Sequence, residues 1–146
     1  MINKINNEVF YSSESHPIIK RSQINLLVKQ AKKNKSQKSR LCTHKNTRDK
    51  LHEMFVVHTN KYKVKPHYHL NKCESLHVLY GSAHLIIFDK FKKIKKKIVL
   101  GTYNSGKIFY YRIKKKVIHS LDIKSKYFVF HEVTLGPFVK KHTIYK

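Results

Sequence analysis

Two histidines and a glutamate, closely spaced between residues 67 and 74, carry side chains that could bind a metal ion. His67 and His69 are separated by one residue, so in a β-strand, where side chains alternate between faces, both imidazoles point the same way. Four residues separate His69 from Glu74, which is enough for a tight reversal that brings the carboxylate back over the imidazoles. Two neutral imidazoles and one carboxylate suit divalent iron, manganese, nickel or zinc. The spacing therefore predicts a metal site.

A third imidazole and a glycine extend this pattern. Gly81 completes the spacing H-x-H-x4-E-x6-G, which resembles the first signature motif of the cupins, and His119 stands where cupins carry another histidine on a later, facing strand. The resemblance implies that one divalent ion is bound by His67, His69, Glu74 and His119, and it leaves the choice among iron, manganese, nickel and zinc open. Any one of these histidines alone would be read as an ordinary surface or core residue.

The elements that must position these ligands are strands, because hydrophobic and polar residues alternate with period two from Arg40 onward. Short turn signals such as Asn104-Ser105-Gly106 separate the runs, and no further helical pattern follows. Such short strands and connections predict an all-β fold, and the resemblance implies the cupin double-stranded β-helix, a jelly-roll barrel. The predicted strands are Glu53–His58, Lys61–His69, Ser75–Tyr80, Ser82–Phe88, Ile94–Leu100, Lys107–Ile113, Val117–Leu121 and Lys126–Val133.

The residues before this region show a different pattern. Val9-Phe10-Tyr11 is a short extended run, and a helix is predicted from Gln23 to Lys33 because its apolar residues recur at i, i+3, i+4 and i+7. Residues 32–39 are polar, basic and aperiodic, which predicts a solvated linker. We therefore expect an N-terminal extension with one helix over residues 1–40 and a barrel domain over residues 41–146.

A more specific resemblance is carried by blocks outside the metal motif. They include Arg40-Leu41-Cys42-Thr43-His44, Phe109-Tyr110-Tyr111-Arg112 and His131-Glu132-Val133-Thr134-Leu135-Gly136-Pro137-Phe138. Together these blocks resemble the WbuC family of cupin-fold metalloproteins, which is associated with bacterial surface-polysaccharide (O-antigen) loci. The chain departs from the pattern at Lys114 and Lys116, where the second cupin motif carries proline and glycine, and at Lys92, where a hairpin glycine is expected. These departures bear on the rigidity of the loops more than on the ligands.

Five residues are candidates for lining a pocket beside the metal. Arg40, Cys42 and His44 belong to a block shared with the resembling family, although simple burial explains Cys42 equally well. Tyr111 and Arg112 are adjacent in one predicted strand, so only one of them can face the cavity. An arginine facing inward could bind a substrate carboxylate or phosphate. The same alternation places His77 on the outer face of its strand if Glu74 points inward.

The net charge of +24, from 32 basic and 8 acidic residues, raises the question of an anionic partner. Only four of the basic residues are arginine, the side chain that reads phosphate and guanine with two parallel hydrogen bonds. Residue types with A/T-rich codons are abundant, so we attribute the lysines to a bacterial genome drifting towards A and T, and we expect no specific nucleic-acid partner.

The sequence also bears on location. Two cysteines form no disulfide framework, and no apolar run is long enough to cross a bilayer. We therefore expect a cytoplasmic protein without a membrane partner.

Two classes of function fit this pattern. The first is a metal-dependent enzyme, isomerase- or epimerase-like, acting on a sugar or nucleotide sugar, with the metal as Lewis acid; with iron, the same open positions would suit an oxygenase. The second is a non-catalytic ligand-binding cupin in which the metal stabilises the barrel. The expected partner is a small molecule, a carbohydrate, and both a monomer and a homodimer remain open. A metalloprotease is excluded because neither His52-Glu53 nor His131-Glu132 continues as H-E-x-x-H.

Overall fold

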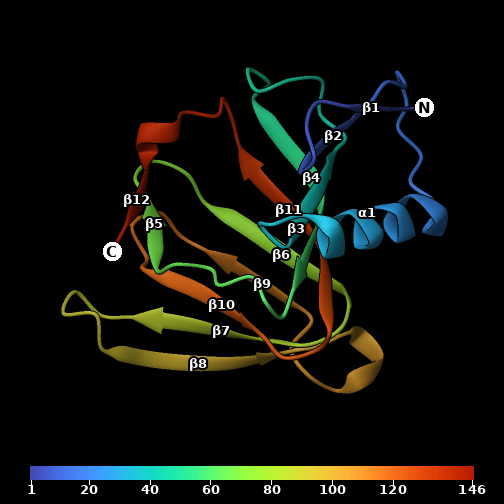
Figure 1. Cartoon of the computed structure of the whole chain (residues 1–146). Coiled ribbons are helices and arrows are strands. Elements are labelled where there is room, and N and C mark those ends of the chain that lie inside the picture. The colour runs from blue at the N-terminus through green and yellow to red at the C-terminus, as the bar shows by residue number, and fades with distance from the viewer.

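Two β-sheets face each other in the computed structural model, which describes residues 1–146, and one helix lies on the outside (Figure 1). The strands are β1 (Ile2–Lys4), β2 (Val9–Ser12), β3 (Lys38–Cys42), β4 (Leu51–Thr59), β5 (His67–His69), β6 (Glu74–Tyr80), β7 (Ala83–Phe88), β8 (Ile94–Leu100), β9 (Tyr110–Ile113), β10 (His119–Ile123), β11 (Tyr127–Leu135) and β12 (Thr143–Tyr145). The helix is α1 (Arg21–Lys33), and single 3-10 turns occur at Tyr103–Ser105 and Lys140–His142. The larger sheet has the order β1-β2-β3-β4-β11-β6-β9 and the smaller one the order β12-β5-β10-β7-β8.

The core lies between the two sheets and follows the alternation of the strands. Leu76 and Val78 on β6 and Phe128 and Phe130 on β11 are buried from the larger sheet, and Leu85 on β7 meets them from the smaller one. Burial of these side chains supplies the main favourable free energy of folding, at about 25 cal/mol for each Å² of apolar surface removed from water. The predicted all-β fold with a short helical extension is confirmed.

The helix α1 covers the outer face of the larger sheet. Leu27 and Ala31 are fully buried against residues of the sheet such as Val57 and Val129, and the Ser39 hydroxyl donates a hydrogen bond to the Leu27 carbonyl at 2.7 Å. The predicted helix is therefore present, beginning two residues earlier than expected. It is too short and too polar to cross a membrane.

Several predicted boundaries differ from the structure, and two strands were not predicted. Residues 38 and 39 of the predicted linker belong to β3, because Asn34 closes the short connection with side-chain hydrogen bonds to the carbonyls of Asn7 and Lys38. The predicted strand Lys61–His69 is a strand only at β5; residues 62–66 form no ladder. The strands β1 and β12 were not predicted, since segments of three residues carry no measurable periodicity.

Five residues have a left-handed backbone, and two of them are glycine: Gln37, Gly81, Lys92, Gly106 and Lys116. Gly81, between β6 and β7, has φ 85°, and a Cβ there would lie 2.5 Å from the Tyr127 carbonyl oxygen, so no other residue fits. Lys92 and Lys116 both have φ 64°. These are the two positions at which the resembling family carries glycine, so the backbone keeps the glycine conformation although the residue is lysine.

Candidate metal centre

Four side chains from both sheets converge inside the barrel. One ligand atom from each of His67, His69, Glu74 and His119 lies within 4.8 Å of the others. The histidines come from the smaller sheet, where His67 on β5 stands in register with His119 on β10. Glu74 opens β6 in the facing sheet. The predicted convergence is therefore observed, and the cluster joins the two layers of the barrel.

The histidine rings are oriented by hydrogen bonds at Nδ1. The Nδ1 atoms of His67 and His119 lie 2.9 Å from the carbonyl oxygens of Lys65 and Val117, respectively. A carbonyl oxygen can only accept, so both Nδ1 atoms carry hydrogen. The Nδ1 atom of His69 lies 3.1 Å from the Thr143 hydroxyl. With Nδ1 engaged in this way, the Nε2 atoms are left to face the centre, which is the arrangement that metal-binding histidines use.

Glu74 and His119 share a proton in the absence of a metal. His119 Nε2 lies 2.8 Å from Glu74 Oε1, and its Nδ1 already donates, so both ring nitrogens donate only if the imidazole is charged. Burial lowers the pKa of His119, but the hydrogen bond and the charge of Glu74 outweigh burial and raise it. Burial likewise raises the pKa of Glu74, yet His119 and His69 hold it well below its usual range. A bound metal ion would therefore displace this proton.

His67 stays neutral, because burial and then the neighbouring charge of His119 lower its pKa to about 4.

His69 differs from the other two histidines in the surroundings of its Nε2 atom. Its Nε2 is buried and lies 3.0 Å from Glu74 Oε2, but out of line for a hydrogen bond, so the atom has no hydrogen-bond partner. The donor set and this orphaned atom both fit a divalent metal ion held by the four residues.

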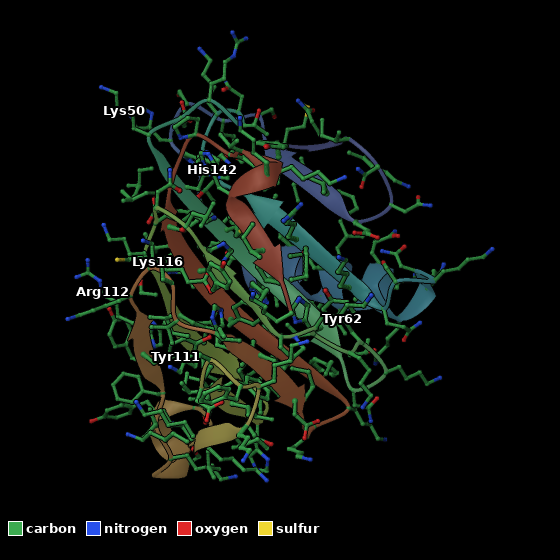
Figure 2. All side chains as sticks on the ribbon, turned by 90° about the vertical axis from the view of Figure 1, so that its left-hand side faces the viewer. Lys50, Tyr62, Tyr111, Arg112, Lys116 and His142 are labelled. Carbon is green, nitrogen blue, oxygen red and sulfur yellow. The ribbon has the colours of Figure 1, made fainter.

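The cluster opens onto a cavity of about 830 Å³ between the sheets. Four of the five pocket candidates line it, namely Arg40, Cys42, His44 and Tyr111. Arg112 does not: it lies on the opposite face of β9 and reaches away from the barrel, while Tyr111 faces inward (Figure 2). Strand alternation allows only one of these neighbours inside, and the register of β9 against β6, with Tyr111 opposite the buried Leu76, selects the tyrosine.

Glu132 is a cavity residue that the sequence analysis did not single out. It stands on β11 opposite Met54 of β4 and Leu76 of β6, so it shares the inward face with these apolar side chains. It makes no hydrogen bond or ion pair within the chain. Burial, followed by the charge of Glu74, raises the pKa of Glu132 to about 7. The sequence does contain a pattern that predicts this position. Phe128, Phe130 and Glu132 follow each other at period two, which places the carboxylate on the same face as the two buried phenylalanines.

His77 lies outside the cluster, as expected from alternation. It is exposed on β6, and its neighbour Leu76 is buried. Its ring contacts Phe109 rather than the other ligand candidates, with ring centroids 5.6 Å apart.

Comparison with solved structures shows that the fold is a double-stranded β-helix. An uncharacterized conserved protein with a double-stranded beta-helix domain from Klebsiella pneumoniae has a TM-score of 0.56 at 11% identity, over 74% of this chain and 78% of that chain. A mutant of Bacillus subtilis oxalate decarboxylase has a TM-score of 0.54 at 18% identity, over 66% of this chain and 24% of that chain. Recombinant pro-11S globulin of pumpkin has a TM-score of 0.52 at 14% identity, over 66% and 23%. The chain thus matches about a quarter of the decarboxylase and of the globulin.

Comparison with protein families gives one match, to a model described as a domain of unknown function (DUF6016), over residues 19–100. This range holds α1 and the ligand candidates His67, His69 and Glu74, and it ends before His119. No curated protein matches the chain at a significant level.

Proposed function

This chain belongs to the family described as a domain of unknown function (DUF6016), and from the chemistry of its site we propose that it is a metal-dependent cupin enzyme acting on a small molecule. The observation that carries the proposal is the cluster of three imidazoles and one carboxylate, with ligand atoms within 4.8 Å of one another, at the wall of an 830 Å³ cavity. A cavity of this volume is within the range that small-molecule sites occupy.

The metal would be held by His67, His69, Glu74 and His119, and it would supply Lewis-acid polarisation of an oxygen atom on the bound molecule. Four protein ligands leave further coordination positions free on an ion that prefers six, such as iron, manganese or nickel. The orphaned Nε2 of His69 is the feature of the chain that a bound ion satisfies directly.

Glu132 is the group in the cavity suited to move a proton. With a pKa of about 7 in the metal-free protein, it exists in both protonation states near neutral pH, as a general acid or base requires. Tyr111 has the complementary property: burial raises its pKa well above the ordinary value, so the hydroxyl stays protonated and can donate a hydrogen bond into the cavity. These two side chains flank Leu76 on the same face of the larger sheet.

The substrate we propose is a sugar or a nucleotide sugar, converted by an isomerase- or epimerase-like reaction of bacterial surface-polysaccharide synthesis in the cytoplasm. Support for this finer assignment comes from the resemblance of the Arg40–Thr143 region to the WbuC family. The cavity is compatible with such a ligand, because Arg40 and Lys72 are cationic, Tyr11 and Tyr62 carry hydroxyls, and apolar side chains such as Met54 form the remaining wall.

The test begins with metal analysis of the purified protein by mass spectrometry, with the protein carrying His67→Ala as the metal-deficient control. The metal-loaded protein is then incubated with sugar phosphates and nucleotide sugars, and isomer formation is followed by proton NMR. Conversion that requires the metal and is lost in Glu132→Gln supports the proposal. Ligand binding without conversion indicates the non-catalytic alternative, and dioxygen consumption with iron indicates an oxygenase. A wild-type protein that binds no divalent metal overturns the proposal.

A further inference from the structure

The short strand that carries two of the ligand candidates depends on the C-terminal strand for its place. All three residues of β5 stand in register with β12, whereas only His67 stands in register with β10. Two main-chain hydrogen bonds of 2.9 Å bracket this pairing, one from Leu70 to the His142 carbonyl and one from Lys146 to the Pro66 carbonyl. Figure 1 shows β5 and β12 side by side at one edge of the smaller sheet.

The three imidazoles differ in the origin of their Nδ1 partners. His67 and His119 each use the main-chain carbonyl two residues earlier, so the chain that leads into each strand supplies the orienting acceptor. His69 uses the side chain of Thr143, which is 74 residues away and stands directly opposite it on β12. His69 is also the ligand candidate whose Nε2 is orphaned. Its orientation is therefore the one that depends on a distant residue.

We propose that Thr143 is a positioning residue for the metal centre, through which the C-terminal strand and metal binding are coupled. The inference rests on the proposed metal site. When Nε2 of His69 binds a cation, its Nδ1 must carry the hydrogen, and the Thr143 hydroxyl at 3.1 Å is the acceptor that holds the ring in this tautomer. Because binding and ordering are reciprocal, an ion bound at the centre in turn stabilises the pairing of β12 with β5.

Thr143→Val keeps the shape and the β-branch of the side chain and removes the hydroxyl, and Thr143→Ser restores the hydroxyl. A matched control is Thr43→Val, since the Thr43 hydroxyl likewise makes one hydrogen bond, which it donates to the main-chain carbonyl of Glu53 on β4, in the larger sheet and away from the cluster. Affinity for Zn²⁺, measured by competition with a chromophoric chelator, should fall about ten- to a hundredfold in Thr143→Val. It should stay within a few-fold of wild type in Thr143→Ser and Thr43→Val.

Two readouts separate orientation of His69 from a general loss of packing. Long-range ¹H–¹⁵N NMR of the metal-free protein should show hydrogen on Nδ1 of His69 in wild type and in Thr143→Ser, and a mixture of the two tautomers in Thr143→Val. In wild-type protein, which needs no variant to fold, Zn²⁺ should slow amide exchange of residues 143–146 more than that of α1.

The outcomes discriminate between this inference and the proposed function. A wild-type protein that binds no divalent metal overturns both. A wild-type protein that binds Zn²⁺, with equal affinity in Thr143→Val or with an unchanged His69 tautomer in that variant, overturns the role of Thr143 alone. Exchange at residues 143–146 that is insensitive to Zn²⁺ overturns the coupling of β12 to the centre.

Discussion

His67 and His69 are useful as a pair only because both point into the barrel, and the same alternation turns His77 outward on β6. We therefore expect His67→Ala or His69→Ala to remove most of the bound metal, because each deletes one donor from a four-ligand set. His77→Ala, the matched control, should leave the metal content nearly unchanged, since His77 is exposed and packs on Phe109. Metal content after gel filtration, at equal protein concentration, measures the difference. Loss of metal in His77→Ala would contradict the assignment of strand faces.

Glu132 should make the stability of the metal-free protein depend on pH. Its pKa is raised from 4.5 in an ordinary glutamate to about 7 in the folded chain. Below pH 4.5 the carboxyl is protonated in both states and costs nothing; between pH 4.5 and 7 it ionises only in the unfolded state, so stability falls as pH rises. Glu132→Gln should therefore be more stable than wild type at pH 8, by up to about 3 kcal/mol, and nearly equal at pH 4.5.

Urea unfolding of the metal-free proteins at the two pH values tests this expectation. Glu53→Gln is the control, since Glu53 is a half-exposed carboxylate on the outer face of the same sheet. A stability difference between wild type and Glu132→Gln that does not change with pH would show that the buried carboxyl is not the titrating group.

At the scale of elements, α1 is held to the sheet by a narrow apolar stripe. Leu27 is fully buried under the helix and its neighbour Leu26 is 39% exposed. Leu27→Ala should lower the free energy of unfolding by about 2–4 kcal/mol, because it leaves a cavity between α1 and the larger sheet. Leu26→Ala should change it by less than about 1 kcal/mol. Urea unfolding gives both values, and metal affinity should be the same in both variants, since α1 lies outside the barrel. Equal costs for the two variants would contradict the packing described.

The turns at Lys92 and Lys116 keep a left-handed backbone without glycine, at a cost of about 1–2 kcal/mol for each residue. Glycine relieves this strain and loses about 0.5–1 kcal/mol to the entropy of the unfolded chain. Lys92→Gly and Lys116→Gly should each raise the free energy of unfolding by about 0.5–1 kcal/mol. Lys90→Gly and Lys115→Gly are neighbouring positions without a positive φ, and there the substitution should destabilise. Thermal unfolding of the four variants measures these changes in stability. Stabilisation by all four or by none would contradict the backbone strain assigned to Lys92 and Lys116.

At the scale of the whole molecule, the net charge of +24 does not by itself indicate a specific nucleic-acid partner. Lysines act on phosphates as point charges and release counterions, so any nucleic-acid binding should be weak, independent of sequence and lost at moderate salt. Fluorescence anisotropy with two unrelated DNA duplexes, at about 50 and 200 mM salt, should give equal affinities at low salt and a fall of several orders of magnitude at high salt. Tight binding at the higher salt with preference for one duplex would overturn our interpretation of the charge.

Local patterns in this sequence were sufficient to predict the features that depend only on residues close together in the chain. Period-two alternation placed His67 and His69 on one strand face, and the spacing to Glu74 anticipated its return over them. His119 came from the cupin resemblance rather than from spacing. The helix was predicted because apolar residues repeat at helical spacing across residues 23–33, and it spans 13 residues in the structure.

What only the tertiary structure decided is the pairing of strands that are distant in the chain. Glu132 became a cavity residue because β11 lies between β4 and β6, and Tyr111 rather than Arg112 faces inward because of the register of β9 against β6. Thr143 met His69 through a strand of three residues that carries no periodic signal. Alternation defines two faces for each strand, but which face is inward and which partner stands opposite are set by burial summed over both sheets, and no local stretch of sequence contains that sum.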